Sequence, residues 1–380
     1  MTLPTELIPL LSDLVAIDSI NPDLVPGAAG EAAIAVYVAD WLARAGLEVT
    51  FDEPARGRPN VVGIVRGTGG GRTLMLNAHT DTVGVAGMTT PFTPRVEGNR
   101  LYGRGAYDMK GSLAACMLAA VRAKAMKLRG DVIVTAVADE EYASIGTASI
   151  VKKWRADAAI VTEPSHLDLC VAHRGFVWLE VETHGIAAHG SRPELGIDAI
   201  AKMGHVLVGL EQLDRDLRAQ PTHALLRSGS LHASLISGGQ ELSSYPARCR
   251  VEVERRTIPG ETPALVEGQI QSILDKLTAA DPQFKAEVRM GLVRAPFEVA
   301  QDEPIVALLQ SQIQQHLGRA PKIYGDQPWM DTAILSAAGI PCVIFGPTGA
   351  GAHAVEEWVD LESVAQCTDV LTATIVAFCA

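Results

Sequence analysis

Residues 72–83 read RTLMLNAHTDTV, an apolar segment that runs directly into polar and ionisable residues. The part Arg72–Ala78 predicts a strand, separated from an earlier predicted strand, Asn60–Arg66, by glycine-rich residues that are typical of a turn. His79 and Asp81 follow where the second strand ends. The change from an apolar strand to polar residues predicts a β-sheet with ionisable side chains at its edge.

Two further segments repeat this junction. Asp131–Ala138 and Ala158–Thr162 are continuous apolar runs, as in strands that are buried on both faces. The first run is followed by Glu140 and Glu141, and the second by Glu163. Because the carboxyl ends of parallel strands line one crevice, these side chains can converge.

Segments with helical spacing alternate with these strands in the first and last parts of the chain. The expected helices are Glu31–Ala45, Met109–Met126, Pro304–Leu317, Asp331–Ala338 and Leu361–Val376, and a further strand is Pro341–Phe345. This alternation predicts an α/β fold with a mixed, mostly parallel sheet that helices flank on both faces.

The middle of the chain has a different order of elements. The expected order is strand Phe176–His184, helix Asp198–Leu217, strands Leu231–Ile236 and Cys249–Ile258, helix Thr262–Ala279 and strand Phe284–Met290. This β-α-β-β-α-β order is the ferredoxin-like pattern. We expect residues 175–290 to form an inserted α+β domain, and residues 1–174 and 291–380 to form one discontinuous domain.

The composition argues against several classes of protein. A chain of 380 residues favours two domains, and 48% hydrophobic with 20% charged residues is typical of a globular protein. Since 44 acidic residues outnumber 32 basic ones, we expect no nucleic-acid partner. The six cysteines lack CxxC spacing. We expect no signal peptide and no contact with a membrane, which makes the cytoplasm the default location.

Two more residues complete a set of candidate metal ligands. Asp108 opens a predicted helix in GRGAYDMKG (103–111), and His353 lies in the glycine-rich loop after strand Pro341–Phe345. Two histidines with several carboxylates suit zinc, with cobalt or manganese as alternatives. Each residue alone also has an ordinary explanation, since an acid after a strand commonly caps a helix or lies in a solvated loop.

The motifs, in this order, resemble those of the metallopeptidase family that contains acetylornithine deacetylase, succinyl-diaminopimelate desuccinylase, glutamate carboxypeptidase and aminoacylase. The similar segments are HTDTV (79–83), GRGAYDMKG (103–111), DEEYASIGT (139–147), TEP (162–164) and GAGAHAVEEWV (349–359). In the middle domain, HGIAAHGSRPELGIDAI (184–200) resembles the lid motif of that family, and CRVEVERRTIPGE (249–261) resembles its arginine strand. The resemblance spans nearly the whole chain.

This resemblance implies a centre of two divalent metal ions in a zinc-exopeptidase-like catalytic domain. Asp108 would bridge the two ions. His79 and Glu163 would complete one metal site, and Glu141 and His353 the other. Two ions held this close lower the pKa of a bridging water and polarise a carbonyl group, which is the chemistry that amide hydrolysis needs.

The resemblance also implies roles for residues next to the ligands. Glu140 would be the general base that takes a proton from the bridging water and returns it to the leaving amine. Asp81 would be the partner of the His79 imidazole, since ligating histidines commonly donate their other N–H to a carboxylate. The peptide bond between Asp108 and Met109 would be cis.

In the middle domain, the resemblance implies a lid that also forms a homodimer. His189 would enter the partner's active site as an oxyanion donor, although the residue by itself is explained equally well as part of a loop. Arg256 would bind the α-carboxylate of the substrate, for which a bidentate guanidinium is well shaped, although it could instead be an exposed strand residue paired with Glu254. Ser243 stands where the family carries asparagine, which alters one expected substrate contact.

The expected activity is metal-dependent hydrolysis of the amide bond of an N-acyl amino acid, as in acetylornithine deacetylase. A carboxypeptidase or dipeptidase that releases a C-terminal amino acid is the alternative, because both reactions cut an amide next to a free α-carboxylate. Glutamate at position 163 favours these two activities over an aminopeptidase within the family. A non-catalytic metal-dependent binding protein is the alternative of a different class, and the general base Glu140 argues against it.

Overall fold

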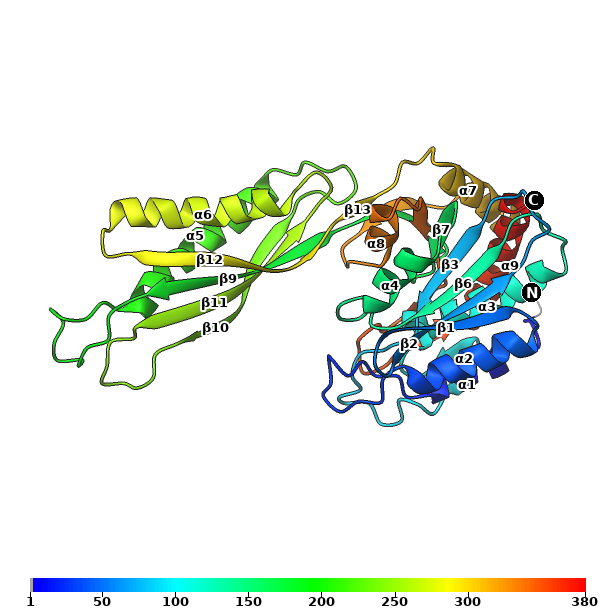
Figure 1. Ribbon diagram of the computed structural model, residues 1–380, viewed down its shortest axis with the longest axis horizontal. Coiled ribbons are helices and arrows are strands. Elements are labelled where there is room, and N and C mark those ends of the chain that lie inside the picture. The colour runs from blue at the N-terminus through cyan, green and yellow to red at the C-terminus, as the bar shows by residue number, and fades with distance from the viewer. Residues whose placement is uncertain (1–2) are drawn as a thin grey trace. The chain divides into compact units, whose positions relative to one another are not determined.

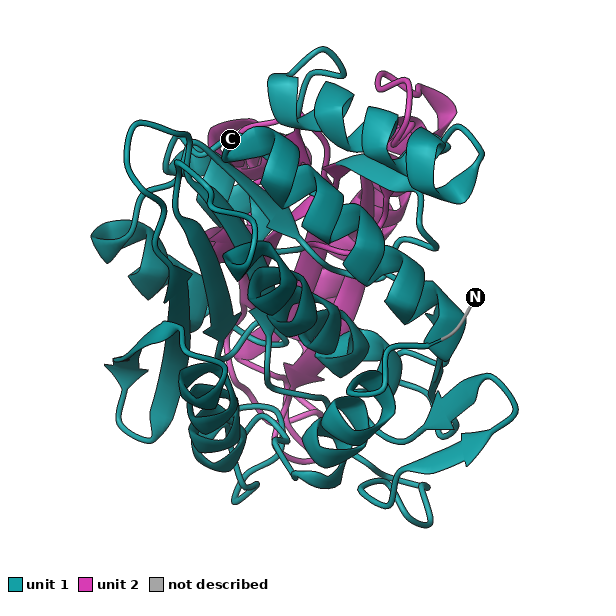
Figure 2. Ribbon diagram, turned by 90° about the vertical axis from the view of Figure 1, so that its right-hand side faces the viewer, with its two compact units in different colours: residues 1–171, 299–324, 330–380 teal, residues 172–298, 325–329 magenta. Residues whose placement is uncertain are grey.

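The structure is a computed structural model that describes residues 3–380 of the 380-residue chain. The chain forms two compact units, each drawn in its own colour in Figure 2. Unit 1 comprises the residues up to Val171 together with Val299–Tyr324 and Met330–Ala380. Unit 2 comprises Ala172–Glu298 and the short segment Gly325–Trp329.

The largest sheet has nine strands. Its order is β1 (Glu48–Ala55), β2 (Arg58–Val65), β6 (Val132–Val137), β3 (Leu74–His79), β7 (Ala158–Val161), β15 (Cys342–Ile344), β8 (Leu169–His173) and β13 (Phe297–Glu298), with β14 (Ile323–Asp326) also pairing with β8. The central strands β6, β3, β7 and β15 run parallel and are buried along their whole length. The pairs of β2 with β6 and of β15 with β8 are antiparallel. These pairings confirm the mixed α/β sheet and its parallel centre.

Helices lie on both faces of this sheet, and the strand order explains why. The chain passes from β3 through α3 to β6, and then from β6 through α4 to β7 on the other side of β3. Because crossovers between parallel strands are right-handed, a reversal of direction places the second helix on the opposite face. Figure 1 shows α3 and α4 on opposite faces. The helices of unit 1 are α1 (Leu7–Ala16), α2 (Ala32–Arg44), α3 (Gly111–Lys124), α4 (Ile145–Lys153), α7 (Pro304–Leu317), α8 (Thr332–Ala337) and α9 (Leu361–Phe378).

The last helix, α9, is buried against its neighbours. With 18 residues it is long and apolar enough to cross a bilayer by length and composition alone. Its buried residues include Val364, Cys367, Leu371 and Phe378, and the helix contacts α3 and α7. Such extensive burial against neighbouring helices is typical of a core helix.

Unit 2 has the predicted β-α-β-β-α-β order. Its elements are β9 (Gly175–His184), α5 (Ala199–Ala219), β10 (Ser230–Gly238), β11 (Arg248–Thr257), α6 (Pro263–Ala280) and β12 (Lys285–Arg294). The strands form an antiparallel sheet in the order β10-β11-β9-β12. Figure 1 shows α5 and α6 over the same face of that sheet. The helices bury Met203, Val206, Leu210, Val266, Ile270 and Leu274, which share one core cluster with sheet residues.

A small four-stranded sheet brings the C-terminal loop beside an earlier part of the chain. Its strands are β16 (Gly349–Ala350), β17 (Trp358–Asp360), β5 (Arg100–Tyr102) and β4 (Arg95–Glu97), in that order. A kinked turn, η1 (Ala106–Lys110), in which Asp108 and Met109 have non-helical backbone angles, leads from β5 into α3, so the regular helix begins at Gly111 and not at Met109 as predicted. The sheet therefore joins the segment that carries His353 to the segment that carries Asp108.

Candidate metal centre

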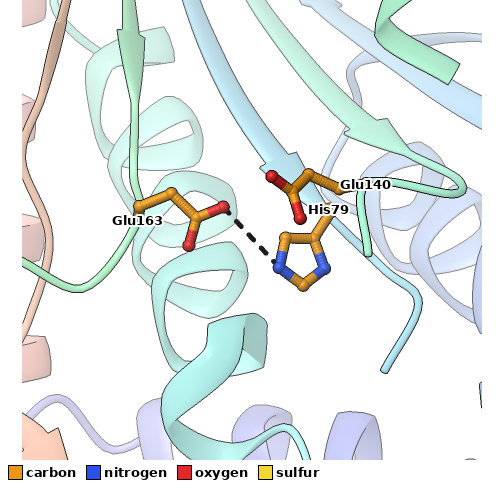
Figure 3. Close-up of side chains that lie close together, drawn as sticks. All are labelled: His79, Glu140 and Glu163. Atoms are coloured by element: carbon orange, nitrogen blue, oxygen red, sulfur yellow. Dashed lines mark ion pairs between the residues drawn. The ribbon is translucent and has the colours of Figure 1, made fainter. Parts of the chain in front are cut away.

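Three of the candidate residues follow neighbouring strands. His79 is the last residue of β3 and pairs with Val137 of β6, while the other neighbour, β7, ends two residues before Glu163. Figure 3 shows His79, Glu140 and Glu163 close together. The His79 Nε2 atom lies 3.6 Å from Glu163 Oε1, and one donor atom from each residue lies within 4.8 Å of the others.

Asp108 lies between two imidazole rings. Its Oδ1 atom is 3.1 Å from Nε2 of His79, and its Oδ2 atom is 3.4 Å from Nε2 of His353. The peptide bond between Asp108 and Met109 is cis, as the sequence analysis expected. The two oxygens of one carboxylate thus face two different histidines, which is the arrangement that a ligand shared by two metal ions requires.

Glu141 and His353 form the other half of the cluster. The His353 Nε2 atom is 3.0 Å from Glu141 Oε2, although the two residues are more than two hundred positions apart. The His353 side chain is 55% exposed, whereas that of Glu141 is only 6% exposed. The other oxygen, Oε1 of Glu141, is buried without a hydrogen-bond partner. A buried oxygen of this kind is normally bonded, so a cation at this position would satisfy it.

The electrostatics of the cluster also favour a cation. Burial raises the pKa of Glu140 well above its ordinary value, and the negative charge of Glu163 raises it further. Burial also raises the pKa of Glu163. Burial would likewise raise the pKa of Asp108, but hydrogen bonds from His353 and His79 outweigh it and hold this pKa below its usual range. Several acids buried this close together repel one another, and a divalent ion would remove that repulsion.

The donor atoms are spaced as metal ligands are. Zinc–nitrogen bonds of about 2.1 Å in a tetrahedral site place neighbouring donors roughly 3.4 Å apart. The distances between donor atoms within the two halves run from 3.0 to 3.6 Å. The residues present therefore fit two divalent ions, with Asp108 between them and Glu140 beside the half that contains His79 and Glu163.

Asp81 makes different contacts from those expected. The Nδ1 atom of His79 lies 2.9 Å from the main-chain oxygen of Asp81, while the carboxylate oxygen Oδ1 is farther away, at 3.6 Å. The carboxylate instead accepts hydrogen bonds from the main-chain N–H groups of Glu140 and Glu141, at 3.1 and 3.2 Å. Asp81 therefore connects the histidine to the turn that carries the two glutamates.

Glu357 is a residue of the centre that the sequence analysis missed. It is 1% exposed and accepts hydrogen bonds from the N–H groups of Gly105, Tyr107 and Asp108, each at 2.9 Å. The guanidinium of Arg104 donates a further bond to it. Glu357 therefore fixes the main chain on which Asp108 is carried. The adjacent acids in GAGAHAVEEWV gave no sign of this, because only the small sheet brings residue 357 beside residue 108.

The candidates His189 and Ser243 lie in unit 2, on two loops that contact each other. The Gly190 N–H donates to the main-chain oxygen of Ser243 at 2.6 Å, and His189 pairs with Ser244 in an isolated bridge. His189 is exposed, and its Nδ1 atom accepts a hydrogen bond from the main-chain N–H of Ser191. In a neutral ring this leaves the proton on Nε2, which is then a donor.

Arg256 is engaged within unit 2. Its Nε atom donates to Glu254 Oε1 at 2.6 Å, and its guanidinium carbon lies 5.2 Å from the centre of the Phe176 ring. The side chain is 31% exposed. The pairing with Glu254 is the simpler of the two explanations that the sequence analysis kept open.

A third group of metal-ligand types lies on the sheet of unit 2. Glu182 and His184 belong to β9, and Glu287 belongs to β12. The Nδ1 atom of His184 faces Glu182 at 3.4 Å, but it is the opposite ring atom, Nε2, that faces Glu287 at 3.4 Å. Arg248 also approaches Glu182, with its Nε atom 3.5 Å from Oε1. The two nitrogens of His184 thus face different carboxylates, although one donor atom from each of the three residues also lies within 4.8 Å of the others.

The sequence is similar to those of known amide-cleaving enzymes. The sequence profile of peptidase family M20/M25/M40 matches residues 75–377. The N-formyl-4-amino-5-aminomethyl-2-methylpyrimidine deformylase of Bacillus subtilis is 29% identical, covering 98% of this chain and 95% of that protein. The acetylornithine deacetylase of Myxococcus xanthus is 31% identical, covering 87% of this chain and 86% of that protein.

Solved structures share the fold over nearly the whole length. The aminopeptidase PepT of Bacillus cereus has a TM-score of 0.81 at 18% identity and covers 100% of both chains. A Bacillus subtilis protein described as a dinuclear metal binding peptidase of the M20 family has a TM-score of 0.77 at 16% identity, covering 99% of this chain and 98% of that chain. At these identities the likeness is one of fold.

Proposed function

The chain belongs to peptidase family M20/M25/M40 and is a metal-dependent amidohydrolase, and we propose that it hydrolyses the amide bond of N-acyl amino acids. The observation that carries the proposal is the position of Asp108 between His79 and His353, with Glu140 close to the same cluster. A binding protein needs ligands but no base, so the half-buried carboxylate of Glu140 beside the ligand set favours a hydrolase.

We propose that five residues hold the metal ions. Asp108 would be shared, His79 and Glu163 would complete one site, and Glu141 and His353 the other. Two divalent ions bound there would supply an acidic water and an electrophile for the amide carbonyl. Zinc is the first choice, because imidazole and carboxylate donors suit it, and cobalt or manganese are alternatives.

Glu140 is proposed to move the proton. Its main-chain N–H is held by the Asp81 carboxylate, which fixes the start of the side chain beside the ligand cluster. As a carboxylate, Glu140 accepts a proton from the attacking water, and as the acid it donates that proton to the leaving nitrogen, which departs as an amine. A carboxyl group whose pKa is raised by loss of solvent contact suits both steps, since its surroundings do not strongly prefer the charged form.

Unit 2 is proposed to be a lid that contributes substrate contacts and pairs with a second copy of the chain. On this proposal Arg256 exchanges part of its contact with Glu254 for the substrate α-carboxylate, and Ser243 contacts the substrate. His189 would donate from Nε2 to the developing oxyanion of the partner's site.

Mixing an inactive Glu140→Ala chain with an inactive His189→Ala chain tests whether His189 acts across a dimer, because some mixed dimers regain one intact site. If the chains exchange and no activity returns, His189 does not act across a dimer.

Two other substrate classes follow from specific observations. A carboxypeptidase or dipeptidase would use the same α-carboxylate contact, so the ligand cluster does not distinguish it. The deformylase relative covers 98% of this chain, and its name describes a formyl amide on a pyrimidine without an α-carboxylate. Ser243, in place of the asparagine expected from the family resemblance, is consistent with a substrate that is recognised differently.

One set of assays distinguishes these activities. The protein is stripped with a chelator, reloaded with zinc or cobalt, and assayed for amine release from N-acetylornithine, other N-acyl amino acids, dipeptides and an N-formyl aminomethylpyrimidine. We expect the highest kcat/KM for an N-acyl amino acid, and Arg256→Ala should lower it by raising KM. If Arg256→Ala leaves every substrate unaffected and the formyl amide is preferred, the N-acyl amino acid proposal is wrong.

A further inference from the structure

We propose that Asn21 and Arg58 are positioning residues that hold the turn carrying Glu140 and Glu141. The expected effect on kcat rests on the proposed function, whereas the expected effect on the turn itself does not. Neither residue contributes to the ligand cluster, and the sequence analysis singled out neither. Both lie in unit 1, Asn21 in the segment between α1 and α2 and Arg58 at the first position of β2.

Asn21 connects two carboxylates through one amide group. Its Nδ2 atom donates to Asp81 Oδ2 at 2.8 Å and to Asp139 Oδ1 at 2.9 Å. Asn21 and Asp139 are fully buried and Asp81 is 1% exposed. An amide NH₂ has two donors, and here both are used. Without them, two buried carboxylates would each lose a partner and would face each other without a donor between them.

The positive charge of the Arg58 guanidinium offsets the negative charge of the carboxylates around Asp139. Its Nη2 atom donates to Asp139 Oδ1 at 2.9 Å, and its Nε and Nη2 atoms together bind both oxygens of Glu31. Its Nη1 atom donates to Asp23 at 2.6 Å. Because a guanidinium is planar and carries five donors, it can bind these carboxylates at once, which a lysine ammonium cannot do in the same geometry.

Asn21 joins the carboxylates of Asp81 and Asp139, and these two carboxylates bind the main chain around the turn that carries Glu140 and Glu141. Asp81 accepts the N–H groups of Glu140 and Glu141. Asp139 has a positive φ of 70°, and its Oδ2 accepts the N–H of Ile145 at the start of α4. A non-glycine residue in this conformation is disfavoured unless its surroundings fix it. The network therefore holds the turn at both ends, so that Glu140 and Glu141 leave it in fixed directions.

The first test measures hydrogen exchange in the full-length, metal-free protein. In Asn21→Ala and Arg58→Lys, the amides of residues 138–146 should exchange about tenfold faster or more, while the core helix α9 keeps its protection. Arg66→Met is the matched control, since Arg66 also pairs with two carboxylates, Glu48 and Asp131, but beyond the opposite end of β2. Unchanged exchange in the turn, or an equal rise in α9, would overturn the positioning role.

The second test is kinetic and uses the zinc-loaded enzyme. Loss of an outer partner of a metal centre typically costs about 10–100-fold, so Asn21→Ala should lower kcat by that factor with KM nearly unchanged. Arg58→Lys keeps the charge and should lose less than Arg58→Met. If the turn loosens but kcat stays at the wild-type value, the positioning role is wrong. If the wild-type enzyme releases no amine from any substrate, it is the proposed function that fails, and the exchange result still decides the structural claim.

Discussion

Within residues 3–380, histidine and glutamate side chains gather in unit 1 and again in unit 2, and the two arrangements differ. In unit 1, two oxygens of Asp108 face the Nε2 atoms of His79 and His353. In unit 2, the imidazole of His184 lies between Glu182 and Glu287 and presents a different nitrogen to each. Similar residue types at similar distances thus place one carboxylate between two imidazoles in unit 1, and one imidazole between two carboxylates in unit 2.

The difference follows from where the residues sit on their sheets. The unit 1 residues follow parallel strands or lie in loops, so their side chains can turn toward a common point beyond the sheet edge. The unit 2 residues occupy the face of an antiparallel sheet, where neighbouring side chains stand side by side. The Nε atom of Arg248 lies 3.5 Å from Glu182 Oε1, an oxygen that is buried without a hydrogen-bond partner.

Metal removal should produce the largest difference between the two groups. Treatment with a chelator should reduce amide hydrolysis to background, and zinc or cobalt should restore it. A protein with both Glu182→Gln and His184→Ala should bind the same number of ions per chain and recover equally. Elemental analysis together with the amine-release assay measures both quantities, and a lower metal content in this variant would make unit 2 a metal site after all.

Replacing the general base should have the next largest effect. Glu140→Gln keeps the shape of the side chain but cannot accept a proton, so kcat should fall by about 10²–10⁴-fold with unchanged metal content. Glu287→Gln, which removes the corresponding charge from the unit 2 group, should leave kcat unaltered. Loss of bound metal in Glu140→Gln would instead identify Glu140 as a ligand.

His353→Ala should weaken metal binding in one half of the centre more than in the other. The side chain is 55% exposed, so its removal should change the free energy of unfolding of the metal-free protein by less than about 1 kcal/mol. The affinity for one of the two ions should fall by at least about tenfold, since a ligand matters no less than an outer partner. Calorimetric titration with zinc checks this result, and two ions bound as tightly as in the wild type would exclude His353 from the centre.

The smallest effect is expected for His184→Ala. The His184 side chain is 33% exposed and Glu287 is 44% exposed, and ion pairs at such positions contribute about 0–1 kcal/mol to stability. Thermal unfolding should therefore shift by a few degrees at most, with wild-type kcat and metal content. A large loss of activity in this variant would show that the two groups are coupled.

The amino-acid pattern alone predicted the strand that ends at His79 and the strands that precede Glu140 and Glu163, because buried parallel strands are continuous apolar runs followed by polar residues. Periodicity also predicted the β-α-β-β-α-β order of unit 2. The kinked turn before α3 was not predictable, since the helical spacing of the residues after Asp108 does not reveal where regular hydrogen bonding begins.

Other residues support this site through contacts that folding alone creates. Glu357 contacts the Asp108 segment, and Asn21 and Arg58 contact the turn of Glu140, across separations of 81 to 252 residues that no local pattern encodes. The tertiary structure also distinguished His79 from His184, since both are histidines at the end of a strand beside acidic residues. Sequence patterns report which face of an element is buried, whereas the direction in which a buried polar side chain points depends on partners that folding brings from elsewhere in the chain.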